Sequence, residues 1–302
     1  MTAVPGERLN VQAVPRPASP LADLLSLTKP RLSSLVLCTL AGGMGLAPGE
    51  LSPARWVLTL LGTAGTVGAA NALNCWLERD RDGLMARTRL RPLPSGRMEP
   101  SVALGFGLGL AAVSLPILAL GSNWLTAALG VLALLSYIVA YTPLKARAAG
   151  AMLVGAVPGA LPPLMGWTAV TDRLGVGGLV LFGILFTWQM PHFLAIALYR
   201  KDEYRAAGLR TCPVVYGDAT TRGWMAAWTV LLVATSLLLV PLGMAGPFYL
   251  AVAVLLGGAF LVLVFLGLVR REGRAWARQT FLFSLIYLAG LFGALLLSGR
   301  AH

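Results

Sequence analysis

Residues 56–82 read WVLTLLGTAGTVGAANALNCWLERDRD. The first 22 of these residues contain no Asp, Glu, Lys or Arg, and the segment then ends in a run of alternating acids and bases. A helix needs about 20 apolar residues to cross a hydrocarbon layer of about 30 Å. The segment therefore predicts a membrane-spanning helix that ends in clustered charge at one membrane face.

The same pattern repeats along the chain. Of its 302 residues, 57% are hydrophobic and 12% charged, and the mean hydropathy is +0.76, which leaves too little polar surface for a soluble domain. We expect an all-α polytopic bundle over residues 32–302, preceded by a cytoplasmic tail over residues 1–31. All 36 charged residues lie outside nine predicted spans, which are 32–48, 56–77, 101–121, 124–142, 150–168, 176–199, 223–243, 247–269 and 279–298.

The basic residues predict the orientation. The chain has 24 Lys and Arg against 12 Asp and Glu, a net charge of +12. With nine spans, 21 of those 24 bases fall on the same side as the N-terminus. The positive-inside rule then places the N-terminus in the cytoplasm and the C-terminus outside. In a soluble chain this excess would suggest a nucleic-acid partner, but here it marks orientation and no nucleic acid is expected.

The charged end of the second span carries candidate ligands. Asn74, Glu78 and Asp82 are spaced at i, i+4 and i+8, so a continuous helix presents them on one face. Two carboxylates one turn apart repel each other, and a divalent cation between them relieves that repulsion. Oxygen ligands without His or Cys favour Mg²⁺. Asp80 lies about 200° from Glu78 around the helix, so it faces away unless the helix loosens.

A plainer interpretation is that these acids belong to a solvated loop and pair with its arginines. The helical spacing and the polar Asn74 inside the span favour a site instead. A second acid pair, Asp202 and Glu203, follows the sixth span on the same side. Acids on two helices at one aqueous edge are what a Mg²⁺-diphosphate ligand requires.

Three further features concern the membrane interior. His192 is the only Asp, Glu, Lys, Arg or His inside the nine spans, and such a group is functional by default because burying it is costly. The alternative is a neutral His bonded to a backbone carbonyl. Span 150–168 holds three prolines and four glycines, which predicts the wall of a cavity. The glycines at 105, 107 and 109 indicate close helix packing.

These motifs resemble the UbiA superfamily of intramembrane prenyltransferases, and most closely its heme O synthase branch. Residues 74–97 contain NxxxExxxD followed by MxRTxxRPLxxG, similar to the first acidic motif of that superfamily. Glu78 stands where Asp is more usual, and Glu203 stands in a common Asp-Asp pair. Other segments similar to the heme branch are TKPR (28–31), YTPLK (141–145), GALPPLMGW (159–167), WQMPHF (188–193) and KDEY (201–204).

The resemblance implies that farnesyl diphosphate and heme b enter a central cavity at the cytoplasmic face of the cell inner membrane. There the farnesyl group is joined to a heme vinyl group with addition of water, assisted by Mg²⁺ on the diphosphate. The implied catalytic residues are Asn74, Glu78, Asp82, Asp202 and Glu203, with Glu78, Asp82 and Asp202 as metal ligands. The implied substrate contacts are Arg87, Arg91, Lys145, Lys201, His192 and Tyr204. Beyond the substrates, the expected partners are membrane lipid and heme A synthase or terminal oxidase assembly proteins.

Two alternatives remain open at this level. A UbiA-type prenyltransferase for another acceptor, such as an aromatic quinone precursor, would share the acids but should not need the MPHF and GALPPLMGW segments. A transporter or an oxidase assembly factor would also be polytopic. Transport sites, however, lie near the membrane midplane, whereas these acids crowd one interface.

Overall fold

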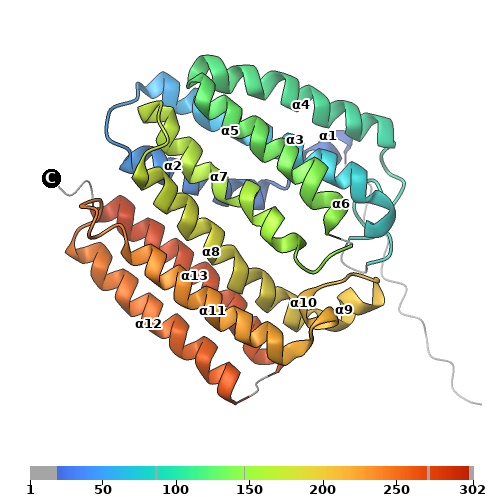
Figure 1. Cartoon of the computed structure of the whole chain (residues 1–302). Coiled ribbons are helices and arrows are strands. Elements are labelled where there is room, and N and C mark those ends of the chain that lie inside the picture. The colour runs from blue at the N-terminus through green and yellow to red at the C-terminus, as the bar shows by residue number, and fades with distance from the viewer. Residues whose placement is uncertain (1–18, 86–87, 146, 271–272, 299–302) are drawn as a thin grey trace, which may run out of the picture.

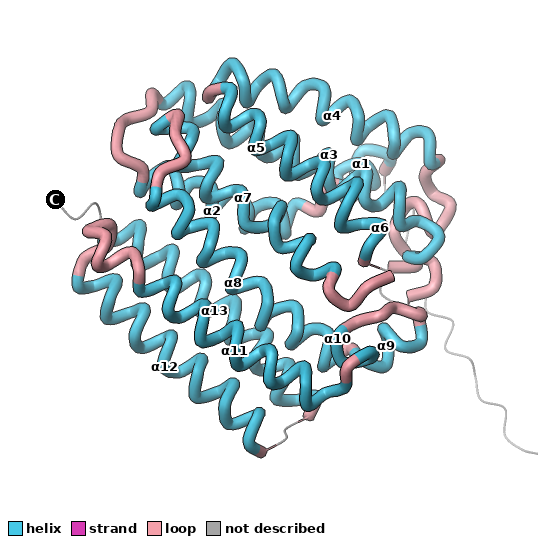
Figure 2. Tube along the Cα trace, in the orientation of Figure 1, coloured by secondary structure: helices cyan, strands magenta, loops and turns pink. Residues whose placement is uncertain are grey.

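The computed structural model describes residues 19–85, 88–145, 147–270 and 273–298. Within these ranges all regular structure is helical (Figure 2), which confirms the all-α prediction. The long helices lie side by side as one bundle (Figure 1). The elements are α1 (Pro20–Leu27), α2 (Pro30–Leu46), α3 (Pro53–Asp82), α4 (Pro100–Gly121), α5 (Trp124–Leu135), the π-helical turn η1 (Ser136–Tyr141), α6 (Thr142–Leu144), α7 (Ala151–Thr171), α8 (Val176–Tyr199), α9 (Lys201–Ala206), α10 (Cys212–Val215), α11 (Gly217–Leu237), α12 (Pro247–Val269) and α13 (Arg274–Ser298).

Proline and capping side chains set where many helices begin. Helices α1 to α4 and α12 all start with proline, whose fixed φ suits the first helical turn and whose missing N–H is not needed there. The Ser52 side chain accepts a hydrogen bond from the Arg55 amide, and that of Asn123 accepts one from Thr126. These bonds satisfy amides that the helix itself leaves free.

Seven helical segments of the described chain are long and apolar enough to cross a membrane. They are α3, α4, the run from α5 through α6, α7, α8, α12 and α13. The 17-residue α2 packs against α7, and α11 packs against α8 and α12. The nine spans and the orientation of the termini therefore stay predictions. The predicted span 223–243 is displaced, because α11 begins at Gly217 and ends at Leu237, shortly before the helix-breaking Pro241.

Glycines let α2 and α7 touch through their backbones. A Cβ at Gly43 would collide with the Pro163 carbonyl, and one at Gly166 would collide with the Leu40 carbonyl. No side chain separates the two helices at this crossing, so each glycine is required for the close approach.

The close packing predicted for the glycines of α4 is only partly correct. Gly107 lies against Leu73 of α3, where an added Cβ would clash. Gly105 and Gly109 have open space around them, so the prediction is wrong for these two positions. They lie on the exposed side of α4, away from the helix that it packs against.

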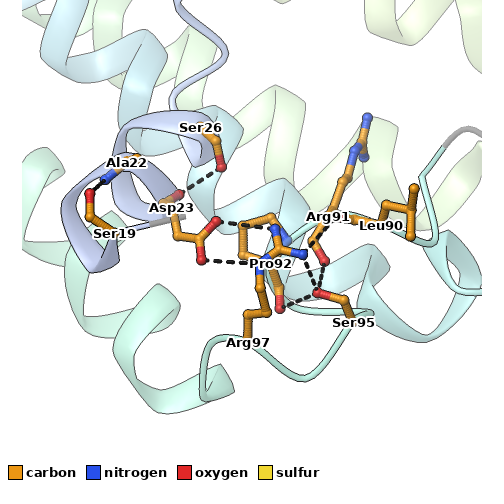
Figure 3. Close-up of polar contacts among 9 residues, drawn as sticks. All are labelled: Ser19, Ala22, Asp23, Ser26, Leu90, Arg91, Pro92, Ser95 and Arg97. Carbon is orange, nitrogen blue, oxygen red and sulfur yellow. Dashed lines mark hydrogen bonds and ion pairs between the residues drawn. The ribbon is translucent and has the colours of Figure 1, made fainter. Parts of the chain in front are cut away.

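The end of the bundle opposite the last turn of α13 gathers α6, α9, α10 and the loop from α3 to α4 (Figure 1). Arg97 of that loop donates through Nε and Nη2 to the Asp23 carboxylate of α1, at 3.2 and 3.1 Å. Its Nη1 donates to the Leu90 carbonyl and to Ser95 Oγ (Figure 3). Because the two-pronged pair places α1 against the loop, Arg97 holds the fold at this end together.

Candidate active site

The inner face of α3 carries the polar residues that the sequence places at helical spacing. Asn74, Glu78 and Asp82 are all buried, and α3 continues without a break to Asp82. The prediction that they share one face is therefore confirmed. Asp80 points the other way, because its side chain is 88% exposed and lies 3.7 Å from Arg79.

The side chains of Asn74, Glu78 and Asp82 each contact a basic side chain. Lys145 Nζ lies 3.2 Å from the Glu78 carboxylate, and Arg91 Nη1 lies 2.6 Å from Asp82 Oδ2. Bases brought from two other segments thus offset the repulsion between the two acids. The plainer interpretation correctly predicted pairing with an arginine, but the acids are buried and do not belong to a solvated surface.

Lys29 is a site residue that sequence reasoning missed. Its Nζ donates to Asn74 Oδ1 at 3.2 Å, and its backbone has a φ of +50° at the start of α2. Burial lowers the pKa of this ammonium below its ordinary value, and the nearby Arg91 and Lys145 act in the same direction. The signal that could have found it is the lysine of TKPR, directly before a predicted span.

The charges of this cluster do not balance among the described residues. Three basic side chains, Lys29, Arg91 and Lys145, face the two carboxyl groups of Glu78 and Asp82, and no described carboxylate pairs with Lys29. Such an excess in a partly buried setting favours an anionic ligand.

The π-helical turn η1 leads into the segment that faces α3. Thr142 Oγ1 accepts a hydrogen bond from Asn74 Nδ2 at 3.2 Å and donates to the Tyr137 carbonyl at 2.8 Å. π-Helical turns are rare and are frequently found at functional sites. The turn precedes both Thr142 and Lys145, so the YTPLK segment supplies two contacts to the inner face of α3.

The charge of Lys145 is influenced by residues of α3 and of the second loop. Burial lowers its pKa, but Tyr141, Glu78 and Tyr204 outweigh that effect and raise the pKa above the ordinary lysine value. Tyr204 belongs to α9, in the second loop. The ammonium therefore stays charged, and α9 lies within electrostatic reach of the α3 cluster.

The acids of the second loop have other neighbours. Glu203 accepts a hydrogen bond from Arg200 at 2.7 Å, and Lys201 donates to Asp218 at 2.6 Å. Asp202 is largely exposed and lies 3.8 Å from Arg205. In the described ranges, no three His, Cys, Asp or Glu side chains are placed to share an ion, so the structure does not join Asp202 to the α3 acids. Arg87 lies outside the described residues.

The donor set of α3 nevertheless fits Mg²⁺. The ion usually takes one or two protein carboxylates and fills its remaining positions with water and substrate phosphates. Glu78 and Asp82 offer two carboxylates, one turn apart, on a face whose surplus charge is positive. These residues suit a metal that arrives with a diphosphate, rather than a closed all-protein site.

An apolar cavity of about 410 Å³ lies between α2, α3, α5, η1, α7, α8 and α13, a size typical of ligand pockets. Its wall includes Asn71, which is about one helical turn from Asn74, so the cavity comes close to the α3 cluster. The prediction for span 150–168 is confirmed, because α7 lines the cavity through Gly155, Pro158, Gly159 and Pro162.

His192 lines the same cavity from α8. Its Nδ1 lies 2.7 Å from Ser284 Oγ of α13, and its ring stacks on Trp188 with centroids 4.6 Å apart. The Trp188 indole donates to the Ser284 carbonyl at 2.6 Å. His192 is therefore hydrogen-bonded, as the plain alternative expected, but its partner is a hydroxyl rather than a backbone carbonyl.

Fold and site together define a helical membrane protein with a cationic end next to an apolar cavity, which suits an amphiphile with an anionic head. Residues 35–286 match the model of the UbiA prenyltransferase family. The chain belongs to this family.

Known proteins agree with that assignment. The chain is 66% identical over 276 residues to the protoheme IX farnesyltransferase of Myxococcus xanthus (strain DK1622). The aligned region covers 91% of this chain and 94% of that protein. A solved digeranylgeranylglyceryl phosphate synthase superposes with a TM-score of 0.80 at 17% identity, covering 93% of this chain and 98% of the other. A UbiA homolog from Archaeoglobus fulgidus bound to GPP and Mg²⁺ gives a TM-score of 0.66 at 17% identity, with 90% and 99% covered. At these identities the solved structures show a shared fold.

Proposed function

We propose that this chain is a prenyltransferase that joins the farnesyl group of farnesyl diphosphate to a vinyl group of heme b, giving heme O and diphosphate. The observation that carries the proposal is the 66% identity, over 91% of the chain, to a protein named for that reaction. The buried acids of α3 and the nearby apolar cavity supply matching chemistry.

The polar end binds the diphosphate. Lys145 and Arg91 lie close to the two acids and offer N–H donors to phosphate oxygens. Arg87, Lys201 and Tyr204 are further proposed contacts from the two loops. Glu78 and Asp82, with Asp202 as a third proposed ligand, would hold Mg²⁺, and the bound ion would supply positive charge to the leaving group. Asn74 and Glu203 complete the proposed catalytic set.

The apolar cavity holds the reacting carbon atoms. The C–O bond of the farnesyl diphosphate breaks and its electron pair leaves with the diphosphate. The π-electron pair of the heme vinyl group then forms the new C–C bond. Water adds to the resulting carbocation and loses a proton. Walls such as those of α7 limit competing water until the vinyl group has reacted, and His192 orients the heme.

The proposed location is the cell inner membrane, with nine spans and the site at the cytoplasmic face. It rests on the 21 of 24 basic residues that share the side of the N-terminus. Heme A synthase or terminal oxidase assembly proteins are the proposed partners that receive the product.

The test is to incubate membranes containing the protein with heme b, farnesyl diphosphate and Mg²⁺, and to separate the extracted hemes by chromatography. We expect heme O in these membranes, and none when farnesyl diphosphate or Mg²⁺ is left out. Prenylation of an aromatic acceptor without any heme O would show that the acceptor is wrong.

A further inference from the structure

Ser284 of α13 is bonded to two residues of α8 that lie one turn apart. Its carbonyl accepts from Trp188 Nε1 at 2.6 Å, and its Oγ lies 2.7 Å from His192 Nδ1. All three residues are buried. The sequence motifs of α8 do not point to Ser284, which lies 92 residues after His192.

The hydrogen bonds of Ser284 determine the tautomer of His192. Ser284 Oγ lies 2.6 Å from the Phe281 carbonyl. A carbonyl can only accept, so the single hydroxyl hydrogen is used in that bond. The contact between Ser284 Oγ and His192 Nδ1 then needs a hydrogen from the ring. His192 is therefore protonated on Nδ1 and keeps its lone pair on Nε2.

Nε2 is left available to a ligand. It receives no hydrogen bond from the described residues, and His192 lies on the cavity wall. The ring is held in place by Trp188 on one side and by Phe281, whose centroid is 4.9 Å away. A neutral imidazole whose Nδ1–H is bonded to a second residue, with Nε2 free, is the usual arrangement of a metal-ligating histidine.

We propose that His192 Nε2 is an axial ligand to the iron of the porphyrin substrate, and that Ser284 is the positioning residue that presents it. The inference rests on the proposed function for the identity of the porphyrin. Ligation from α8 holds the ring system about 10 Å along the helix from its end at Tyr199. The bond from Ser284 increases the donor strength of Nε2, because Nδ1–H is already donated.

The test compares two porphyrins on purified, detergent-solubilised protein. Heme b and metal-free protoporphyrin IX have the same ring and propionates, but only heme b offers iron to Nε2. We expect His192→Gly to weaken binding of heme b far more than binding of protoporphyrin, which has no iron to lose. We expect Ser284→Ala to weaken heme b binding about 10- to 100-fold, which is typical for loss of a residue behind a metal ligand, with protoporphyrin unchanged.

Ser236→Ala is the matched control. Ser236 is as fully buried as Ser284, and its hydroxyl accepts from Tyr287 at 3.0 Å, but it does not line the cavity. This variant should bind both porphyrins as the wild type does. Resonance Raman spectra of the ferrous complex give a second measurement. The iron–histidine stretch should appear in the wild type, shift to lower frequency in Ser284→Ala and vanish in His192→Gly. Adding imidazole to His192→Gly should give the spectrum of imidazole-bound heme.

Equal weakening of both porphyrins in either variant would overturn the inference, as would an unchanged iron–histidine band in His192→Gly. Binding is measured without turnover, so the two proposals fail separately. Heme O formation without an iron–His192 bond would contradict ligation alone. Ligation of heme b through His192 without heme O formation would contradict the proposed function alone.

Discussion

At the residue scale, Asp80 and Asp82 show how a helix separates two nearby carboxylates. They are two positions apart, so about 200° of helical rotation divides them. Asp82 lies inside against Arg91, with 3% of its side chain exposed, whereas the Asp80 side chain is 88% exposed. The charge of Asp82 therefore lies at the proposed diphosphate site, and that of Asp80 does not.

This difference predicts unequal effects of the same substitution. Asp82→Asn removes a proposed metal ligand and leaves Arg91 without its partner, so heme O formation should fall by about 100-fold or more. Asp80→Asn should keep a rate near that of the wild type. Both rates are measured in membranes with equal amounts of protein, judged by immunoblot. A normal rate in Asp82→Asn would refute the assigned role.

The sequence predicts the polar face of α3 well, but not the side chains from other helices that contact it. Helical spacing alone places Asn74, Glu78 and Asp82 together, because their relative positions depend on one helix. Lys29 reaches Asn74 from 45 residues away, and Ser284 reaches His192 from 92 residues away. Such contacts depend on how helices pack, and no local pattern specifies that.

At the element scale, the helix ends differ from the limits of the charge-free stretches for physical reasons. The predicted span 56–77 stops at the first acid, but α3 continues to Asp82, because Glu78 and Asp82 are paired against the bundle. The π-helical turn η1 lies inside the predicted span 124–142, and its sequence gives no local sign of the wider turn. The proline-rich α7 was predictable as a cavity wall because prolines and glycines are poorly suited to a straight, lipid-facing helix.

The backbone contact between α2 and α7 gives a prediction about packing. Gly166→Ala places a methyl group against the Leu40 carbonyl, so the helices must separate and the protein should lose about 1–3 kcal/mol of stability. Gly109→Ala is the matched control, since open space surrounds that position of α4. Thermal unfolding in detergent measures both variants. Equal stability of the two would show that the α2–α7 contact is not tight.

At the scale of the whole molecule, charged residues are distributed unequally between the two ends of the helical bundle. Helices α6, α9 and α10 lie at one end of the bundle together with the loop that follows α3, opposite the last turn of α13 (Figure 1). Most of the basic residues fall in these and other segments that the sequence assigns to the N-terminal side. We interpret the net charge of +12 as the orientation signal of the proposed topology, in which the few acids among the bases mark the candidate site.

The orientation is testable by labelling. In a chain whose three cysteines are replaced, Glu99→Cys reports on the loop before α4 and Arg173→Cys reports on the loop before α8; both positions are exposed. A membrane-impermeant maleimide added to spheroplasts should label Arg173→Cys at once and Glu99→Cys only after the membrane is opened. The reverse pattern would place the acids of α3 on the outer face.

The most direct test of the central claim follows the farnesyl group itself. Membranes with the protein receive farnesyl diphosphate labelled in its carbon chain, heme b and an aromatic quinone precursor together, in water enriched in ¹⁸O. We expect mass spectrometry to find the labelled chain and one ¹⁸O atom on the heme, with the aromatic acceptor unlabelled. Label on the aromatic acceptor with heme b unchanged would contradict it.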